Sequence, residues 1–349
     1  MEENVESTIL EKGAILCFGE LLLRLSPDTG ANWLHESKMP VYVGGAELNV
    51  ATALAMWNVP VKYFTALPEN FLSRQILSHI SQKNIDVSMV HFSGNRIGTY
   101  YLPEGSDMKN AGVIYDRALS SFATLAPGTI IWDTILEGIS WLHFSAICPA
   151  LSVEAADLCM EMLQAAVSKN ITISIDLNYR SKLWQYGNKP DEIMPGLAKY
   201  CDIIMGNVWA AQMMLAIPIE EQLIKKGEKK AYIMQAEHSS AAILKEYPRC
   251  KAVFNTFRFD QSSPLVYYTT LYTSDKLYVS EEYHTNQVID KVGSGDCFMA
   301  GIIYGYYNNF PVQNLLDFAT QAAYRKLFIK GDAIDLTADA ILQNVNENV

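Results

Sequence analysis

The sequence lacks the features of a secreted, membrane-spanning or metal-binding chain. Its six cysteines include no Cys-x-x-Cys pair, and its six histidines show no metal-ligand spacing. Most cysteines lie in apolar runs, which indicates buried thiols in a reducing compartment rather than disulfides. No run approaches the roughly 18–20 apolar residues that a membrane helix needs. Residues 1–4 are acidic and have no apolar stretch, unlike a signal peptide. We therefore expect a cytoplasmic protein with no membrane partner.

Positive charge is also scarce. The chain has 27 lysines and arginines against 38 acidic residues, a net charge of −11. A nucleic-acid partner is not expected, because phosphate backbones require a basic surface. A few local arginines could still bind a small anion. Of the 349 residues, 50% are hydrophobic and 19% are charged. This composition is ordinary for a globular enzyme, and the length fits one large α/β domain or two smaller ones.

Strand-like and helix-like segments alternate along the chain. The predicted strands are residues 14–18, 61–67, 139–145, 171–177, 203–205 and 252–257. The predicted helices are residues 71–83, 153–169, 294–307 and 312–330. This alternation is typical of a mostly parallel sheet covered by helices on both faces, so we expect an α/β fold with three α/β/α layers.

Two long, extended, aromatic segments, about 22–43 and 96–117, interrupt this alternation. Two later regions differ from each other in their predicted secondary structure. Residues 206–247 are predicted to be mostly helical. Residues 267–280 are rich in tyrosine and threonine, and they are predicted to form a β-ribbon.

A glycine motif, Gly293-Ser294-Gly295-Asp296, precedes a helical apolar pattern. Glycine allows a tight turn and the close approach of phosphate, and the N–H groups of such a turn at a helix N-terminus can hold an anion. Asp296 would lie beside that anion hole and could remove a proton from a hydroxyl that attacks a bound phosphate. The alternative is a plain glycine turn with Asp296 as the helix N-cap.

A second glycine motif joins an extended segment to a helical one. Gly44 and Gly45 would admit a ligand close to the backbone, and Asn49 offers an amide for hydroxyl groups. The alternative is a strand-to-helix turn with an exposed Asn49.

Two arginines follow aromatic or strand-end positions. Arg180 comes just after the predicted strand that ends in Asp176-Leu177, and Arg117 follows Tyr115. Ligands of open α/β sheets bind beyond the carboxyl ends of the strands, where a guanidinium can hold a carboxylate or phosphate. The pair favours an acidic sugar over a neutral one. The alternative is solvated surface charge.

Five motifs together resemble those of the ribokinase-like carbohydrate kinases, also called the phosphofructokinase-B family, and in particular 2-keto-3-deoxygluconate kinases. They are residues 18–27, 44–49, 115–117, 176–184 and 290–296. The resemblance runs from about Ile15 to Asp332. It implies a single kinase domain over residues 1–349, in which segments 22–43 and 96–117 form a small β-sheet lid. It also implies ATP and Mg²⁺ as cofactors, and we expect a homo-oligomer, a dimer or higher.

The resemblance assigns roles to individual residues. Asp296 would be the catalytic base, and Gly293, Ser294 and Gly295 the anion hole. The implied sugar-binding residues are Gly44, Gly45, Asn49, Tyr100, Tyr115, Arg117, Arg180 and Asp332. The implied nucleotide-binding residues are Asn178, Asn207, Thr256, Arg258, Gly293 and Gly295. No residue is assigned as a direct metal ligand.

One position departs from the family pattern. The family carries Asn-x-x-Glu, whose glutamate helps to organise magnesium, but this chain has Asn207-Val208-Trp209-Ala210. Phosphate oxygens could still hold the metal, although losing such a carboxylate typically costs about 10–100-fold in metal affinity or activity. The sequence predicts a kinase that converts 2-keto-3-deoxygluconate to its 6-phosphate. Two alternatives stay open: a kinase for another sugar such as fructose, and a catalytically weak protein that binds or senses sugar acids.

Overall fold

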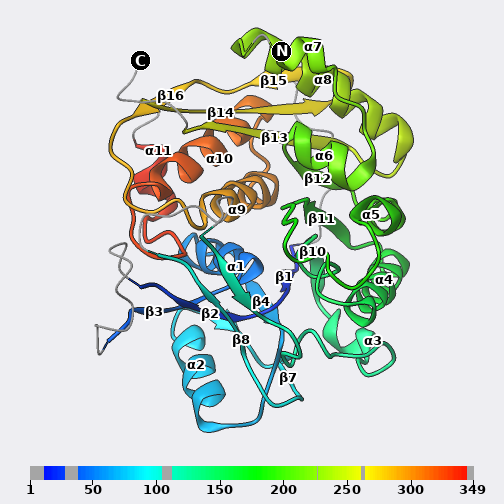
Figure 1. The fold of residues 1–349 in the computed structure, drawn as a ribbon, viewed down its shortest axis with the longest axis vertical. Helices are drawn as coiled ribbons and strands as arrows, with labels where there is room; N and C mark the ends of the chain where they lie inside the picture. The colour runs from blue at the N-terminus through cyan, green and yellow to red at the C-terminus, as the bar shows by residue number, and fades with distance from the viewer. Residues whose placement is uncertain (1–11, 28–37, 104–111, 226, 261–263, 344–349) are drawn as a thin grey trace.

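The computed structural model describes residues 12–27, 38–103, 112–225, 227–260 and 264–343. Within these ranges no helix is both long and apolar enough to cross a membrane. The described part of the chain forms one large sheet, a small four-stranded sheet and helices around the large sheet (Figure 1).

The large sheet has ten strands in the described ranges, in the order β15-β14-β13-β12-β11-β10-β1-β4-β6, with β16 also paired to β14. From β6 to β13 in this order, each strand pairs in parallel with the next. Their bounds are β1 Ala14–Phe18, β4 Val61–Phe64, β6 Ile85–Asp86, β10 Ile139–Ser145, β11 Thr172–Asp176, β12 Ile203–Gly206 and β13 Ala252–Phe259. The last strands, β14 Leu265–Thr273, β15 Lys276–Val279 and β16 Tyr283–Thr285, are antiparallel.

Side chains of each central strand alternate between two hydrophobic cores. Ile15 and Cys17 of β1 belong to one core, whereas Leu16 and Phe18 belong to the other. Successive side chains of a strand point to opposite faces, so a strand that is apolar throughout must be covered on both sides. The expected three-layer arrangement follows from this pattern.

Each core is closed by its own group of helices. The first group packs against the face with Ile15, and it comprises α1 Ala46–Met56, α2 Phe71–Ser81, α9 Ser294–Tyr307, α10 Val312–Lys326 and α11 Ala338–Leu342. The second comprises α3 Trp132–Ile135, α4 Val153–Ser168, α5 Pro190–Ala198, α6 Val208–Leu215 and part of α8 Lys229–Glu246, which follows the short α7 Glu221–Ile224. Figure 1 shows α9 and α10 on one side of the sheet and α4 and α5 on the other.

The small sheet is built from the two segments that interrupt the alternation. Its order is β3 Val41–Gly44, β2 Leu22–Leu25, β8 Gly98–Tyr101 and β9 Ile114–Asp116. Residues 28–37 and 104–111 of these segments lie outside the described residues. That this sheet acts as a lid stays a prediction.

Several boundaries differ from the sequence-based expectation by one to four residues. The expected strand 61–67 divides into β4 and β5 Ala66–Leu67, because β5 leaves the main sheet and pairs with β7 His91–Phe92. The expected helix 312–330 ends at Lys326, and β13 continues to Phe259. The helical region 206–247 and the β-ribbon are confirmed within the described residues. The ribbon is the β14–β15 hairpin, whose turn residues Ser274 and Asp275 both have positive φ, as a type I′ hairpin turn requires.

Two helix-interior glycines give a matched test of this packing. A Cβ atom on Gly301 of α9 would lie 2.5 Å from the Cα atom of Ala319 on α10, whereas one on Gly196 of α5 would meet only the Met160 Cε atom, at 3.6 Å. We expect Gly301→Ala to lower the free energy of unfolding by about 1–3 kcal/mol through overpacking. Gly196→Ala should be neutral or raise it by up to about 1 kcal/mol. Urea denaturation measures both, and equal effects would contradict the α9–α10 contact.

Candidate active site

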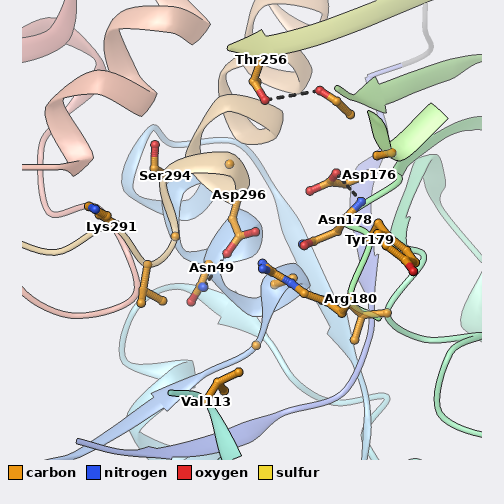
Figure 2. Close-up of a pocket in the computed structure, with 18 of the residues that line it drawn as sticks. Asn49, Val113, Asp176, Asn178, Tyr179, Arg180, Thr256, Lys291, Ser294 and Asp296 are labelled. Carbon is orange, nitrogen blue, oxygen red and sulfur yellow. Dashed lines mark hydrogen bonds between the residues drawn. The ribbon is translucent and has the colours of Figure 1, made fainter. Parts of the chain in front are cut away.

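A cavity of about 730 Å³ lies where the small sheet faces the carboxyl ends of the parallel strands. Its walls come from the small sheet, from the ends of β11, β12 and β13, and from the first turn of α9 (Figure 2). Most of the residues expected in a site line it: Gly45, Asn49, Tyr100, Tyr115, Arg117, Asn178, Arg180, Asn207, Thr256, Arg258, Gly293, Ser294, Gly295 and Asp296. Gly44 and Asp332 are not among the lining residues, although the Asp332 carboxylate accepts a hydrogen bond from the hydroxyl of Tyr100, which is.

The turn before α9 is shaped by Gly293. This residue is the N-cap of the helix and has φ 79°, and a Cβ atom on it would lie 1.8 Å from the backbone oxygen of Asp332. Only glycine fits there. On the other side of the turn a Cβ on Gly295 would meet only the Met205 Cε atom, at 3.9 Å. The Ser294 hydroxyl donates to the Ala323 carbonyl, at 3.0 Å. The backbone N–H groups at the N-terminus of α9 therefore face the cavity, where they can bind an anion.

Asp296 is a buried carboxylate in the first turn of α9, and it accepts a hydrogen bond from Asn49 Nδ2 at 2.7 Å. The N-cap of α9 is Gly293, with no side-chain cap, so the alternative in which Asp296 caps the helix is wrong. Burial raises the pKa of Asp296 to about 8; Asp176 and Glu47 add to the rise, and Asn49 and Arg180 oppose it. A carboxylate whose pKa lies near neutral pH suits general base catalysis.

The Gly44-Gly45 turn brings a second helix N-terminus to the same cavity. A Cβ atom on Gly45, where φ is 141°, would lie 2.4 Å from the backbone oxygen of Glu20, and one on Gly44 would lie 2.3 Å from Asp332 Oδ2. Asn49, on the first turn of α1, is buried, so the alternative of an exposed Asn49 is wrong. Its bond to Asp296 joins the first turns of α1 and α9.

The two arginines differ in their partners. Arg117 is buried and its Nε donates to Glu20 Oε2 at 2.7 Å, so its charge is compensated inside the protein. Arg180 is half-buried, and its Nε has no hydrogen-bond partner among the described residues. Its side chain extends toward Asp296 and Asn49 in Figure 2. Of these two arginines, Arg180 is therefore the one whose charge is available to an acidic ligand, and neither is solvated surface charge.

The expected nucleotide-binding residues lie at the strand ends. The Asn178 N–H group donates to Asp176 Oδ1 at 3.0 Å. Asn207 caps α6 by accepting from the Ala210 N–H group at 2.9 Å. Thr256 Oγ1 donates to the Gly206 carbonyl at 3.3 Å, which joins β13 to the end of β12. These bonds fix the backbone at this side of the cavity, while contact with a nucleotide stays a prediction.

A buried ion-pair network behind the cavity was not expected from the sequence. Arg24 of β2 pairs with Asp290, Nη2 to Oδ2 at 3.0 Å, and with Asp332, Nε to Oδ1 at 2.8 Å. Tyr100 donates its hydroxyl to Asp332 Oδ2 at 3.2 Å, and Asp290 accepts the Val292 N–H group at 3.0 Å. The network ties the small sheet to the turn before α9. It also occupies the Asp332 carboxylate, which the resemblance had assigned to the sugar.

Two further carboxylates at the cavity carry no signal that sequence spacing could have revealed. Glu47 accepts hydrogen bonds from the Ser145 N–H group, at 2.9 Å, and from its hydroxyl. Burial raises the pKa of Glu47 despite these bonds. Glu20 holds Arg117, as described above. Glu20 lies in the motif of residues 18–27 and Glu47 in that of residues 44–49, but neither was assigned a role from the sequence.

No ready-made metal cage is found in the described part of the chain, where no group of three or more histidines, cysteines or acidic residues could hold an ion. Ala210 lines the cavity on the first turn of α6, three residues after Asn207. The position that the resemblance expects to carry a carboxylate thus faces the site with a methyl group. Mg²⁺ would have to bind mainly through oxygens of a ligand and water, a common arrangement for this ion.

The chain belongs to the pfkB family of carbohydrate kinases, whose family model matches residues 12–245. The fold and the site agree with that membership: a mostly parallel sheet between helices, and a buried aspartate at a glycine turn. The chain is therefore a sugar kinase, of a family that uses ATP.

Individual relatives are similar over nearly the full chain. The 2-dehydro-3-deoxygalactonokinase of Haloferax volcanii is 24% identical over 94% of this chain and 95% of its own. The structure of 2-dehydro-3-deoxygluconokinase from Thermotoga maritima is 30% identical, with a TM-score of 0.85 over 96% of this chain and 99% of its own. In fold alone the chain is similar to the Xylella fastidiosa fructokinase with bound ATP, at 17% identity and a TM-score of 0.73 over 97% of this chain and 99% of its own.

The raised pKa of Asp296 predicts how its removal changes stability. Between about pH 4 and pH 8 the folded protein keeps a proton on Asp296 that the unfolded chain releases, so folding is destabilised progressively as the pH rises. We expect Asp296→Asn to be more stable than the wild type, with a difference that grows by roughly 1.4 kcal/mol per pH unit up to about pH 8. Urea denaturation at pH 5, 6.5 and 8 measures it.

Asp86→Asn is a control for which the expected change in stability has the opposite sign. Burial pushes the pKa of Asp86 up, but hydrogen bonds from Ser88 outweigh it and lower that pKa. This control should be less stable than the wild type near neutral pH. A stability difference for Asp296→Asn that does not change between pH 5 and pH 8 would refute the perturbed ionisation of Asp296.

Proposed function

We propose that the protein transfers the γ-phosphoryl group of ATP to a primary hydroxyl of a sugar acid, most specifically O6 of 2-keto-3-deoxygluconate. The observation that carries this proposal is the buried Asp296 carboxylate at the first turn of α9, with the Arg180 side chain directed toward it in the same cavity. The names of the Haloferax and Thermotoga relatives support the same substrate class.

Asp296 acts as the base that receives the proton of the attacking hydroxyl. Asn49 fixes the orientation of this carboxylate through its 2.7 Å bond. The backbone N–H groups of residues 293–295 stabilise the negative charge of the transferring phosphoryl group. Mg²⁺, when bound through the phosphates, would neutralise part of the same charge. Closure of the small sheet would exclude water, which otherwise competes as acceptor.

Arg180 selects for an acidic substrate. A guanidinium binds a carboxylate in a forked geometry, and a charge-assisted hydrogen bond contributes roughly 1.5–3 kcal/mol. Arg117 contributes less net charge, because Glu20 compensates it. Tyr100 and Tyr115, whose ring centroids lie 6.3 Å apart, form an aromatic wall of the cavity on which the carbon chain of the sugar would pack.

The remaining expectations belong to this proposal. A cytoplasmic location is supported by the six free cysteines, all buried. A homo-oligomer is supported by Val41 and Ile114, which are 54% and 52% exposed on the two edge strands of the small sheet. An unpaired strand edge with apolar residues favours association. A single domain over the whole chain, with the small sheet as its lid, is proposed on the same basis.

Ala210 favours a second candidate, a protein that binds or senses sugar acids with little turnover. The loss of a metal-organising carboxylate would suit that role. The buried, perturbed Asp296 favours the kinase, because a pure binding protein has no use for a base beside an anion hole. A kinase for a neutral sugar such as fructose fits less well, because such a sugar has no acid group for Arg180 to bind.

A substrate panel tests the proposal. We expect kcat/KM with ATP and Mg²⁺ to be higher for 2-keto-3-deoxygluconate and its galacto epimer than for fructose or ribose. Arg180→Ala should lower it for the acids by about 10–100-fold and leave it nearly unchanged for neutral sugars. Asp296→Asn should reduce kcat by about 10²–10⁴-fold while sugar-acid binding is retained. Equal values for acids and fructose would end the sugar-acid proposal, and binding of a sugar acid without any turnover would favour the sensor.

A further inference from the structure

Two cationic side chains stand together beside the anion-binding turn. Lys291 precedes Gly293 by two residues, and Arg258 lies on β13; both line the cavity. Lys291 Nζ lies 2.9 Å from Asp260 Oδ2, and Arg258 Nε lies 3.6 Å from the same oxygen. Figure 2 places Lys291 next to the turn that carries Ser294. One carboxylate thus holds two cations at the edge of the cavity.

This trio is neither deeply buried nor freely solvated. The side chains of Lys291, Arg258 and Asp260 are 21%, 12% and 27% exposed. Water reaches each partner of these pairs, which weakens them relative to a fully buried ion pair. The Asp260 carboxylate can therefore be exchanged for another anion at low cost, while the two cations keep their positions.

The cavity carries no ready-made set of metal ligands in the described part of the chain. Ala210 presents a methyl group, and within the described ranges no cluster of three or more metal-ligating side chains exists. Glu20 is neutralised by Arg117, and Glu47 is bonded to Ser145. The phosphates of a nucleotide repel one another and need positive charge nearby. Here the protein supplies more of that charge itself.

We propose that Lys291 and Arg258 form a phosphate clamp for the nucleotide, with Asp260 as the anion that positions both cations until the phosphates replace it. The clamp rests on the proposed kinase function and deepens it. Lys291 supplies a compact point charge, and Arg258 supplies a planar fork of donors. The ligand is a nucleoside polyphosphate, recognised here by its phosphate tail rather than by its base.

The clamp predicts nucleotide binding without a divalent cation. In EDTA the wild type should bind ATP more tightly than ADP, and ADP more tightly than AMP, because each phosphate adds charge. Lys291→Met should weaken ATP binding in EDTA by about 10–100-fold, the range for losing a charge-assisted hydrogen bond. It should change AMP binding little and leave binding of a sugar acid unchanged. Isothermal titration calorimetry at low ionic strength measures all of these affinities.

Lys251→Met is the matched control. Lys251 also pairs with an aspartate, Asp202, but it lies at the amino end of β13, away from the cavity. This variant removes the same charge from the protein and should leave ATP affinity within about twofold. A loss as large as that of Lys291→Met would mean that only net charge matters, which would overturn the clamp.

Asp260→Asn should change ATP affinity in the opposite direction to Lys291→Met. Removing the carboxylate removes the competitor of the phosphates, so ATP should bind several-fold more tightly in EDTA. A merely structural role for Asp260 predicts equal or weaker binding. If Lys291→Met and Asp260→Asn bind ATP like the wild type in EDTA while the wild type turns over Mg·ATP, the clamp is wrong and the kinase proposal stands. If the wild type binds no nucleotide with or without Mg²⁺, both proposals fall.

Discussion

The site depends on the burial of one carboxylate. Asp296 is held at the N-terminus of α9 by the amide of Asn49, which lies at the N-terminus of α1. This bond brings two helix starts to one point, where their unpaired N–H groups favour anions. Burial of an ionisable carboxylate opposes folding at neutral pH, and it gives the protein a base near the pH at which it must act. At this residue, the burial that favours catalysis therefore lowers the stability of the fold.

The surrounding structure keeps that geometry in place. Gly293 fits against the backbone of Asp332 with no room for a side chain, and Arg24 holds Asp332 and Asp290 in a buried network. Through Arg24, a strand of the small sheet is tied to the turn that binds the anion. Removing one member of such a network would leave buried charge unpaired, which is strongly destabilising. The network therefore links the placement of the sugar-facing sheet to that of the phosphate-facing turn.

Much of this could be predicted from the sequence. The three layers followed from apolar strands alternating with helical segments, and the Gly293–Asp296 and Gly44–Asn49 motifs led directly to the two turns at the cavity. What spacing could not supply were contacts between distant positions. Arg24 reads as an ordinary strand residue until the fold places it beside Asp290, and Glu20 became relevant only through Arg117. The contacts of the Asp332 carboxylate with Arg24 and Tyr100 are of the same long-range kind, and its assignment to the sugar stays a prediction. Lys291 was visible in the motif, yet its pairing with Asp260, the residue after β13, is a contact that only the fold reveals.

The central claim is that Asp296 is the base of phosphoryl transfer and that its burial sets the pH range of the reaction. The direct test is the pH dependence of kcat/KM for the sugar acid between pH 5.5 and 9.5. We expect kcat/KM to rise about tenfold per pH unit and to level off near the pKa of Asp296, about 8 in the unliganded protein. A profile that is flat across this range would contradict the account.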